Sequence, residues 1–320
     1  MINKKMIPLI ITTSLFVLLF SIGAIQFDGF GSARVFFNLF SDNAFLIITA
    51  VGMTFVILSG GIDLSVGAVI ALTGVICSLL ITQYHWSPLL VFPFVLILGT
   101  IFGSIMGAII HYYSIQPFIV TLAGMFFARG LASVLSEESI PIDHEFYNQI
   151  SAFGFEFLDG AWIGSSSIIC LVVVIFAVVI AHYSRFGARV YALGGDAKSA
   201  ALMGVPIAST TIRIYALSSF LATLAGIVYS FYTFSGYSLA AVGVELDAIA
   251  AVVIGGTLLT GGRGYVIGSL LGVLIMGVVQ TYISFDGNLS SWWTKIVIGI
   301  LLFAFIALQQ LLSLTNKSKH

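Results

Sequence analysis

Long apolar runs separated by short polar stretches extend along the whole chain. About 20 consecutive apolar residues are enough to cross a bilayer as an α-helix. The pattern predicts ten such helices, at residues 7–25, 43–58, 63–82, 88–110, 117–135, 163–182, 212–233, 245–259, 264–284 and 293–313. The second and eighth runs are short, so we expect these helices to stop before the far interface or to follow a re-entrant path. The predicted fold class is an all-α polytopic integral membrane protein, in which residues 1–320 form one transmembrane domain.

The positions of the charges orient the predicted helices. With ten spans and the N-terminus in the cytoplasm, nine of the twelve Lys and Arg residues fall on the cytoplasmic side, as the positive-inside rule expects. The loop 136–162 falls outside and carries six acidic residues but no Lys or Arg. All four tryptophans fall at outer helix ends, where indole rings favour the interface. Both termini are therefore predicted to be cytoplasmic, and residues 183–212 form the largest cytoplasmic loop.

The composition narrows the class of protein. Hydrophobic residues make up 59% of the 320 residues and charged residues only 8%, whereas about a quarter of an average soluble protein is charged. The net charge of −1 leaves no basic surface for nucleic acid. A soluble enzyme, a nucleic-acid-binding protein and a disordered chain are excluded. Cys77 and Cys170 lie in apolar runs and are expected to be buried small hydrophobic residues.

Sequence motifs of common enzymes are absent. The chain contains no Gly-Lys pair, and therefore no phosphate-binding loop of the Gly-x-x-x-x-Gly-Lys-Ser/Thr type. It also contains no His-Glu-x-x-His and no Gly-x-Ser-x-Gly, and its five histidines are scattered. We predict no catalytic residue and no metal ligand. A component of a transporter is the default interpretation of a ten-span bundle with little soluble mass.

The first informative stretch is residues 59–65, Ser-Gly-Gly-Ile-Asp-Leu-Ser, which separates two apolar runs. The glycine pair permits a sharp turn. Asp63 precedes the next helix, where it would act as an N-cap by accepting hydrogen bonds from the first amides. The other interpretation places Asp63 and Ser65 in a gate near the cytoplasmic side, because ionisable groups at membrane depth are costly and often functional. The two roles are compatible.

The second informative stretch lies in the loop 183–212. Asp196 is predicted to cap a short helix from Ala197 to Met203, which Gly204 and Pro206 would end. A helix of about seven residues is unstable alone in water, so it must pack against something. One alternative is the cytoplasmic face of this chain itself. The other is a groove on a separate motor protein, which would receive a small apolar surface formed by Ala197, Ala200, Ala201 and Met203.

The chain resembles the permease subunits of bacterial ABC sugar importers of the ribose type. The stretches that carry the resemblance are Val51–Gly67, Tyr191–Asp196, Gly255–Thr257 and Gly261–Gly264. Many members of that family have Asn in place of Asp196. The resemblance covers nearly the whole chain, and within the family Ser136–Ile142 and Ser290–Ile296 are most similar to permeases of galactofuranose importers.

This resemblance implies a non-enzymatic permease of the bacterial inner membrane, which forms a sugar pathway with a second permease subunit, identical or related. A partner ABC ATPase would bind ATP and magnesium, and a periplasmic sugar-binding protein would deliver the sugar near the periplasmic loop 136–162. The permease itself would hold no cofactor. The candidate ATPase-coupling residues are Gly194, Gly195 and Asp196, which match the coupling region of the family, together with five residues of the predicted short helix and its end: Ala197, Lys198, Ala200, Ala201 and Gly204.

Other polar and aromatic residues are candidates for the pathway. Four polar side chains would line it or join helices to one another: Asn43, Thr54, Thr257 and Gln280. Arg129 would snorkel outward or pair with Glu137 or Glu138. Glu245 and Asp247 would interact favourably with the dipole of the helix they begin, or contact sugar. Four aromatic residues would form an interfacial belt or a stacking surface: Phe231, Tyr232, Phe234 and Tyr237.

The alternative function is an ion-coupled or uncoupled secondary sugar transporter or channel. Such a protein needs an ionisable relay near the membrane midplane. The candidates Asp63, Arg129 and Glu245 fall towards the ends of their predicted helices. This placement disfavours the alternative.

Overall fold

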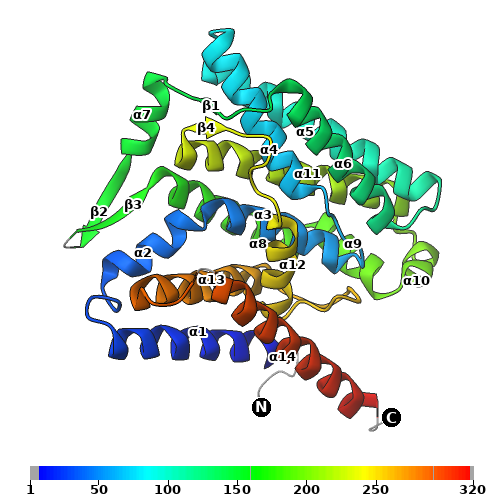
Figure 1. Cartoon of the computed structure of the whole chain (residues 1–320). Helices are drawn as coiled ribbons and strands as arrows, with labels where there is room; N and C mark the ends of the chain where they lie inside the picture. The colour runs from blue at the N-terminus through cyan, green and yellow to red at the C-terminus, as the bar shows by residue number, and fades with distance from the viewer. Residues whose placement is uncertain (1–6, 159, 291, 318–320) are drawn as a thin grey trace.

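Each of the ten predicted apolar runs contains a helix in the computed structural model, which describes residues 7–158, 160–290 and 292–317 (Figure 1). These helices are α1 (Ile7–Gln26), α3 (Ala44–Leu58), α4 (Val66–Ser78), α5 (Pro88–Tyr112), α6 (Pro117–Leu135), α8 (Ser165–Tyr183), α11 (Ile207–Thr233), α12 (Val244–Ile254), α13 (Val266–Asp286) and α14 (Trp292–Lys317). The all-α polytopic fold class is confirmed. Within the described chain, eight helices are long and apolar enough to cross a membrane. The total of ten crossings and the cytoplasmic side of both termini stay predictions.

One helix was not predicted from the sequence. Helix α2 (Ala33–Asp42) precedes α3 and is bent from it by 58°. Its polar residues, including Arg34 and Asp42, interrupt the apolar run, so hydropathy alone does not reveal it. If α2 and α3 together form one span, the described chain has up to nine membrane-spanning candidates.

Two crossings combine a short helix with non-helical chain. Helix α4 begins only at Val66, after the non-helical stretch 59–65. Its C-terminal end continues as a π-helical turn, η2 (Leu79–Gln83). Helix α12 has 11 residues and follows the largely non-helical stretch 237–243, so the expectation of a short eighth helix is confirmed. The two helices meet at their N-terminal ends. Gly67 of α4 lies so close to the Glu245 carboxylate of α12 that a Cβ atom on Gly67 would collide with it. Irregular backbone at membrane depth is tolerated where protein buries it or where it lines a cavity.

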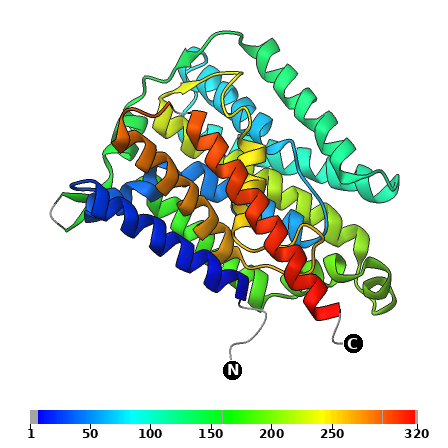
Figure 2. The same ribbon diagram turned by 60° about the horizontal axis from the view of Figure 1, so that its bottom comes forward.

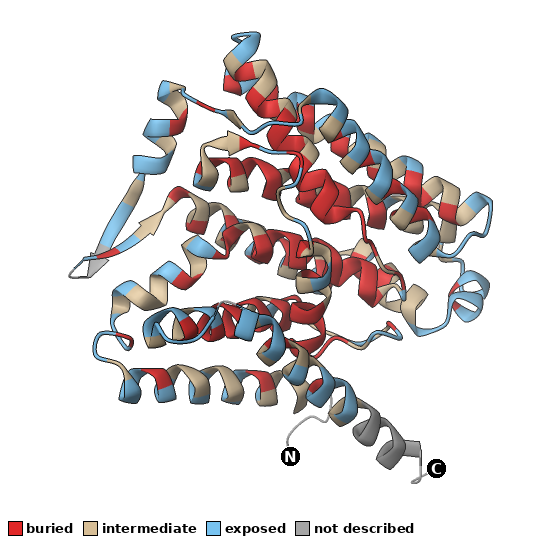
Figure 3. Ribbon diagram, in the orientation of Figure 1, coloured by how far each residue is buried: buried red, intermediate tan, exposed pale blue. Residues whose placement is uncertain are grey.

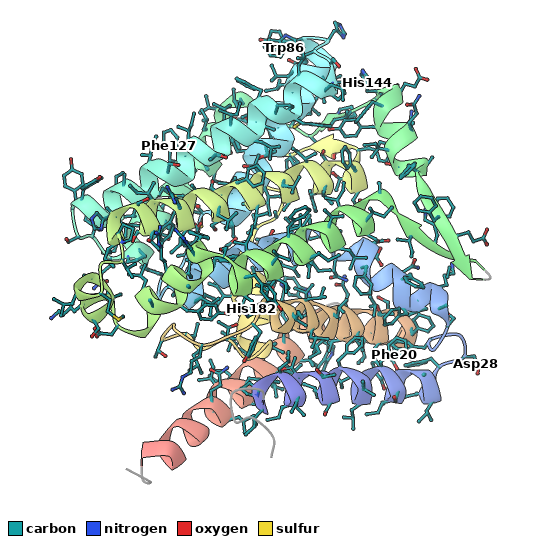
Figure 4. All side chains as sticks on the ribbon, turned by 180° about the vertical axis from the view of Figure 1, so that it is seen from behind. Phe20, Asp28, Trp86, Phe127, His144 and His182 are labelled. Atoms are coloured by element: carbon teal, nitrogen blue, oxygen red, sulfur yellow. The ribbon has the colours of Figure 1, made fainter. Side chains whose placement is uncertain are left out.

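The central helices are buried and the outer helices expose apolar side chains. Residues of α3, α4 and α12 are mostly buried, whereas α1, α5, α6 and α14 carry many exposed residues (Figure 3). Figure 2 shows α1, α13 and α14 side by side along one face. Phe127 of α6 points away from the bundle (Figure 4). These exposed apolar surfaces suit contact with lipid.

Shorter elements lie at the two opposite ends of the bundle (Figure 1). One end carries α9 (Arg185–Gly195) and α10 (Ala197–Leu202), and α11 then begins at Ile207, five residues earlier than predicted. The other end carries the segment 136–162, which contains four short elements: β1 (Ile140–Pro141), α7 (Glu145–Ala152), β2 (Gly154–Leu158) and β3 (Ala161–Gly164). Strand β2 pairs with β3, and β1 pairs antiparallel with β4 (Ser235–Gly236). We call the α10 end the inner end and the other the outer end.

The terminal helices also have their chain ends at the inner end. Pro8 of α1 lies against Gly256, directly after α12. Gln309 of α14 donates a hydrogen bond to the carbonyl of Val253 over 3.2 Å. The cytoplasmic location of both termini stays a prediction. Lys4, Lys5 and Lys319, which contributed to that prediction, lie outside the described residues.

Candidate coupling site and transport path

Asp196 caps helix α10 as predicted. Its Oδ1 accepts a hydrogen bond from the Ser199 amide over 2.6 Å. The hydrogen bonds from Ser199 lower the pKa of the Asp196 carboxyl below its ordinary value. The helix ends at Leu202, one residue earlier than predicted, and Gly204 follows with a φ of +81°. The sequence therefore encodes both ends of this six-residue helix locally.

Helix α10 packs on its own chain by one residue and exposes the rest. Ala200 is fully buried, so its predicted place in an exposed apolar surface is wrong. Leu202, which the sequence interpretation did not include, is 90% exposed, and Met203 is 73% exposed. Ala197, Lys198 and Ala201 are exposed as well. Two large apolar side chains in water at the tip of a short helix suit contact with a partner protein.

The end of α9, directly before α10, contacts two other chain segments through backbone atoms. We call this contact the glycine junction: Gly60, Gly194, Gly261 and Gly262. The amide of Gly262 donates to the Leu58 carbonyl over 2.9 Å. A Cβ atom on Gly194 would collide with the same carbonyl and lie 2.6 Å from the Gly262 nitrogen. The end of α9 therefore touches both the end of α3 and the loop after α12.

Three of the junction glycines are also required by backbone conformation. Gly60, Gly261 and Gly262 have φ angles of +83°, +83° and +73°, which residues with a Cβ atom rarely adopt. Tyr191 of α9 adds a side-chain tie, because its hydroxyl donates to the Gly264 carbonyl over 2.8 Å. The three segments therefore form one tightly packed unit at the inner end.

Asp63 lies in a fully buried polar cluster between α4 and α11. Its Oδ1 accepts from the Ser65 amide over 2.9 Å and from the Ser65 hydroxyl over 2.6 Å. Its Oδ2 accepts from the Ser218 hydroxyl over 2.8 Å. The N-cap of α4 is Ser65, so the prediction of Asp63 as the N-cap is wrong by two residues. The carboxylate instead ties the turn before α4 to the middle of α11.

The comparisons with known proteins decide the family. Residues 35–306 match a family described as the permease component of branched-chain amino acid transport systems. The inner membrane ABC transporter permease protein YjfF of Escherichia coli (strain K12) is 59% identical over 307 residues, which cover 96% of this chain and 93% of that relative. The chain belongs to this family of permeases. No solved structure matches the permease.

Two further relatives carry a sugar in their names. The fructose import permease protein FruG of Bifidobacterium longum (strain NCC 2705) is 41% identical, over 96% of this permease and 92% of FruG. The ribose import permease protein RbsC of Escherichia coli (strain K12) is 36% identical, over 83% of this permease and 82% of RbsC. The resemblance to ribose-type importer permeases is confirmed, and so is a multi-pass location in the inner membrane. The family consists of transport components rather than enzymes.

No hydrogen bond joins the four polar path candidates of the permease, all within the described chain, to one another. Thr54 joins α3 to α13, because its hydroxyl lies 2.7 Å from that of Ser269. Asn43 donates to the Leu39 carbonyl over 2.9 Å at the bend between α2 and α3. Gln280 is exposed on α13, and the buried Thr257 hydroxyl has no hydrogen-bond partner among the described residues. Their roles in a pathway stay predictions.

Arg129 contacts backbone rather than the predicted acidic side chains. Its Nη1 donates to the carbonyls of Ser238 and Ala240 over 2.7 and 2.6 Å. The expected pairing with Glu137 or Glu138 is therefore wrong, because the non-helical stretch before α12 offers unpaired carbonyls closer by. Asp247 of α12 forms an ion pair with Lys295 of α14 over 2.7 Å.

The four predicted aromatic residues do not form one surface, although Phe231 and Phe234 both pack on Tyr147. Phe231 packs on Tyr147 of α7, with ring centroids 5.1 Å apart, whereas Tyr232 is exposed. Tyr237 lines a cavity at the outer end together with Phe45 and Tyr229. The sequence interpretation missed Phe45 and Tyr229, because nothing in the linear pattern brings the start of α3 to the end of α11.

Replacing Asp196 tests whether the cap of α10 matters for coupling. We expect Asp196→Ala to lower sugar-stimulated ATPase activity of the assembled transporter by roughly threefold, because the Ser199 amide loses its acceptor. Asp196→Asn retains an acceptor oxygen and should stay near the unmodified rate. Equal activity of the two variants would show that the cap is dispensable.

Proposed function

We propose that the permease is the membrane-spanning subunit of an ATP-driven importer of a neutral monosaccharide, and that this sugar is galactofuranose. The contact of the end of α9, directly before α10, with the end of α3 and the loop after α12 through the glycine junction carries the proposal. The sugar class is supported by the names of FruG and RbsC. Galactofuranose is supported by the similarity of Ser136–Ile142 and Ser290–Ile296 to permeases of galactofuranose importers.

The mechanism that we propose transmits motion and involves no covalent chemistry in this subunit. A partner ABC ATPase binds ATP and magnesium and contacts the exposed side of α10, where Leu202 and Met203 lie. Its movement displaces α9, and the glycine junction passes the displacement to α3 and to the loop after α12. The interrupted crossings then rearrange as rigid bodies, so that the pathway opens alternately to each side.

Two further partners complete the proposed assembly. A second permease, identical or related, forms the other half of the pathway. A periplasmic sugar-binding protein docks at the outer end, where the described part of the segment 136–162 exposes five acidic side chains: Glu137, Glu138, Asp143, Glu145 and Glu156. Complementary charges would steer the two proteins together and make association sensitive to salt.

The alternative is an ion-coupled or uncoupled secondary sugar transporter or channel. It requires an ionisable group that exchanges an ion during transport. Glu245 has one carboxylate oxygen buried without a hydrogen-bond partner among the described residues. Asp63 is the fully buried carboxylate, and its oxygens accept hydrogen bonds from Ser65 and Ser218. These neutral donors fit a fixed structural tie between α4 and α11, which favours the ATP-driven function.

Reconstitution tests the proposal. The permease is placed in proteoliposomes with its ATPase, a second permease and the binding protein, and uptake of radiolabelled galactofuranose, ribose, fructose and leucine is measured. We expect uptake of galactofuranose only with ATP and magnesium on the ATPase side. Accumulation of solute by the permease alone, without nucleotide, would establish the alternative. Preferential uptake of leucine would contradict the sugar class.

A further inference from the structure

A cavity of about 550 Å³ lies at the outer end, beside the non-helical stretch 237–242. Its walls also include Phe45 at the start of α3, Tyr229 near the end of α11 and Ser139 of the outer segment. Small-molecule sites typically enclose about 300–1,000 Å³. The cavity is therefore large enough to hold a small solute, and it lies where interrupted backbone replaces a helix.

The lining combines aromatic rings with free hydroxyl groups. The rings of Phe45 and Tyr229 pack edge to face, with centroids 4.9 Å apart. Four lining side-chain hydroxyls make no hydrogen bond to any described residue: Ser139, Tyr229, Ser235 and Tyr237. These hydroxyls can both donate to a ligand and accept from it. Aromatic faces suit the apolar C–H face of a sugar ring, and free hydroxyls suit its polar edge.

All described residues that line the cavity are neutral. A zwitterionic amino acid placed there would find no charged lining side chain to pair with its ammonium or its carboxylate. A polyhydroxylated neutral molecule can satisfy the available groups. We infer that the cavity is a binding site for a neutral monosaccharide on its way into the permease. This inference rests on the proposed sugar import and adds the place where the permease itself holds the sugar.

The non-helical wall of this site is fixed on one side by Arg129. Its guanidinium donates to the carbonyls of Ser238 and Ala240. Ala240 lines the cavity, so Arg129 acts as a positioning residue for the wall without lining the cavity itself. Hydrogen bonds from a charged donor are stronger than neutral ones, which suits the task of fixing irregular backbone.

The other side of the wall is fixed to the outer segment. Strand β4 pairs with β1, and the Ile142 amide donates to the Phe234 carbonyl over 2.8 Å. Ser139 directly precedes β1 and lines the cavity. The segment that carries the exposed acidic side chains is thus part of the wall of the sugar site. A protein that docks on this segment would contact a structure continuous with the cavity.

Transport by variants of the complete transporter tests the site. Tyr229→Leu removes an aromatic face and a hydroxyl, and Ser139→Trp fills the exposed rim of the cavity. We expect each to lower galactofuranose uptake by roughly tenfold at equal amounts in the membrane. Tyr232→Leu is the matched control, because Tyr232 lies on the same helix, is exposed and does not line the cavity. Its uptake should equal that of the unmodified transporter.

A labelling measurement reports occupancy without relying on transport. Both native cysteines of the permease are buried, so Ser139→Cys introduces an accessible thiol at the rim of the cavity. In the assembled transporter, galactofuranose should cause a saturable loss of maleimide labelling of the permease at this position, whereas leucine should not.

The outcomes separate the site from the proposed function. If the unmodified transporter imports sugar but Tyr229→Leu and Ser139→Trp behave like Tyr232→Leu, and labelling is insensitive to sugar, the site is overturned and the function stands. If the unmodified transporter imports no neutral monosaccharide, both are overturned. If the Tyr229→Leu variant misfolds, uptake by the Ser139→Trp variant and the maleimide labelling at position 139 still decide whether the site exists.

Discussion

Gly194→Ala is expected to abolish sugar uptake, or to reduce it by more than about tenfold, in a transporter that still inserts into the membrane. The added Cβ atom would collide with the Leu58 carbonyl and lie 2.6 Å from the Gly262 nitrogen. Both are backbone atoms, so no flexible side chain can move aside. Alanine within a helix is otherwise about 0.5–1 kcal/mol more favourable than glycine. Loss of uptake would therefore report the collision in the glycine junction.

Gly195→Ala is the matched comparison. Gly195 follows Gly194 at the end of α9, and a Cβ atom there meets nothing within 4 Å among the described residues. This variant should retain most of the uptake and most of the sugar-stimulated ATPase activity. The measurement is ATP-dependent uptake alongside ATPase activity in proteoliposomes. In the Gly194 variant, ATPase activity without uptake would indicate uncoupling, which is what transmission through the junction predicts. If both variants were equally active, the junction would have no part in coupling.

Asp63→Ala is expected to have the next largest effect, on both stability and transport. The substitution removes the acceptor of three hydrogen bonds, two from Ser65 and one from Ser218. A buried polar group left unsatisfied costs about 1–3 kcal/mol, and two hydroxyls and an amide lose their partner here. We expect a lower unfolding temperature of the detergent-solubilised permease, together with strongly reduced uptake. Ser218→Ala removes one of the three bonds and should have a smaller effect.

Asp63→Asn separates a structural tie from an ionisable relay. The amide side chain has nearly the same shape and retains one acceptor oxygen, but it cannot lose or gain the charge. If Asp63 is a tie, the Asn variant should keep most of the uptake and lie between the unmodified permease and the Ala variant in stability. A stable Asn variant without any uptake would instead support the ion-coupled alternative.

Several features of the permease could be predicted from the sequence because they are set locally. The apolar runs fix which segments form helices, and the short run after Gly243 correctly indicated the short helix α12. Asp196 and Gly204 mark the two ends of α10, because a capping carboxylate and a glycine act within a few residues of their position. Helix α2 escaped prediction because Arg34 and Asp42 interrupt its apolar pattern.

Contacts between distant segments could not be predicted in this way. The carbonyl partners of Arg129 lie more than 100 residues away, in the non-helical backbone between α11 and α12. Ala200 was assigned to an exposed surface because composition does not tell which side of a six-residue helix faces its own chain. The pairing of β1 with β4 joins two-residue strands, which are too short to leave a periodic signal.

The sequence by itself determined that this chain is a helical membrane permease and where helix α10 begins and ends, because hydropathy and capping depend on neighbouring residues. Only the tertiary structure decided which segments meet. It brought Gly194 against Leu58 and Gly262, and Phe45 against Tyr229. Such contacts depend on the mutual packing of several helices, and one-dimensional patterns carry no information about which faces come together.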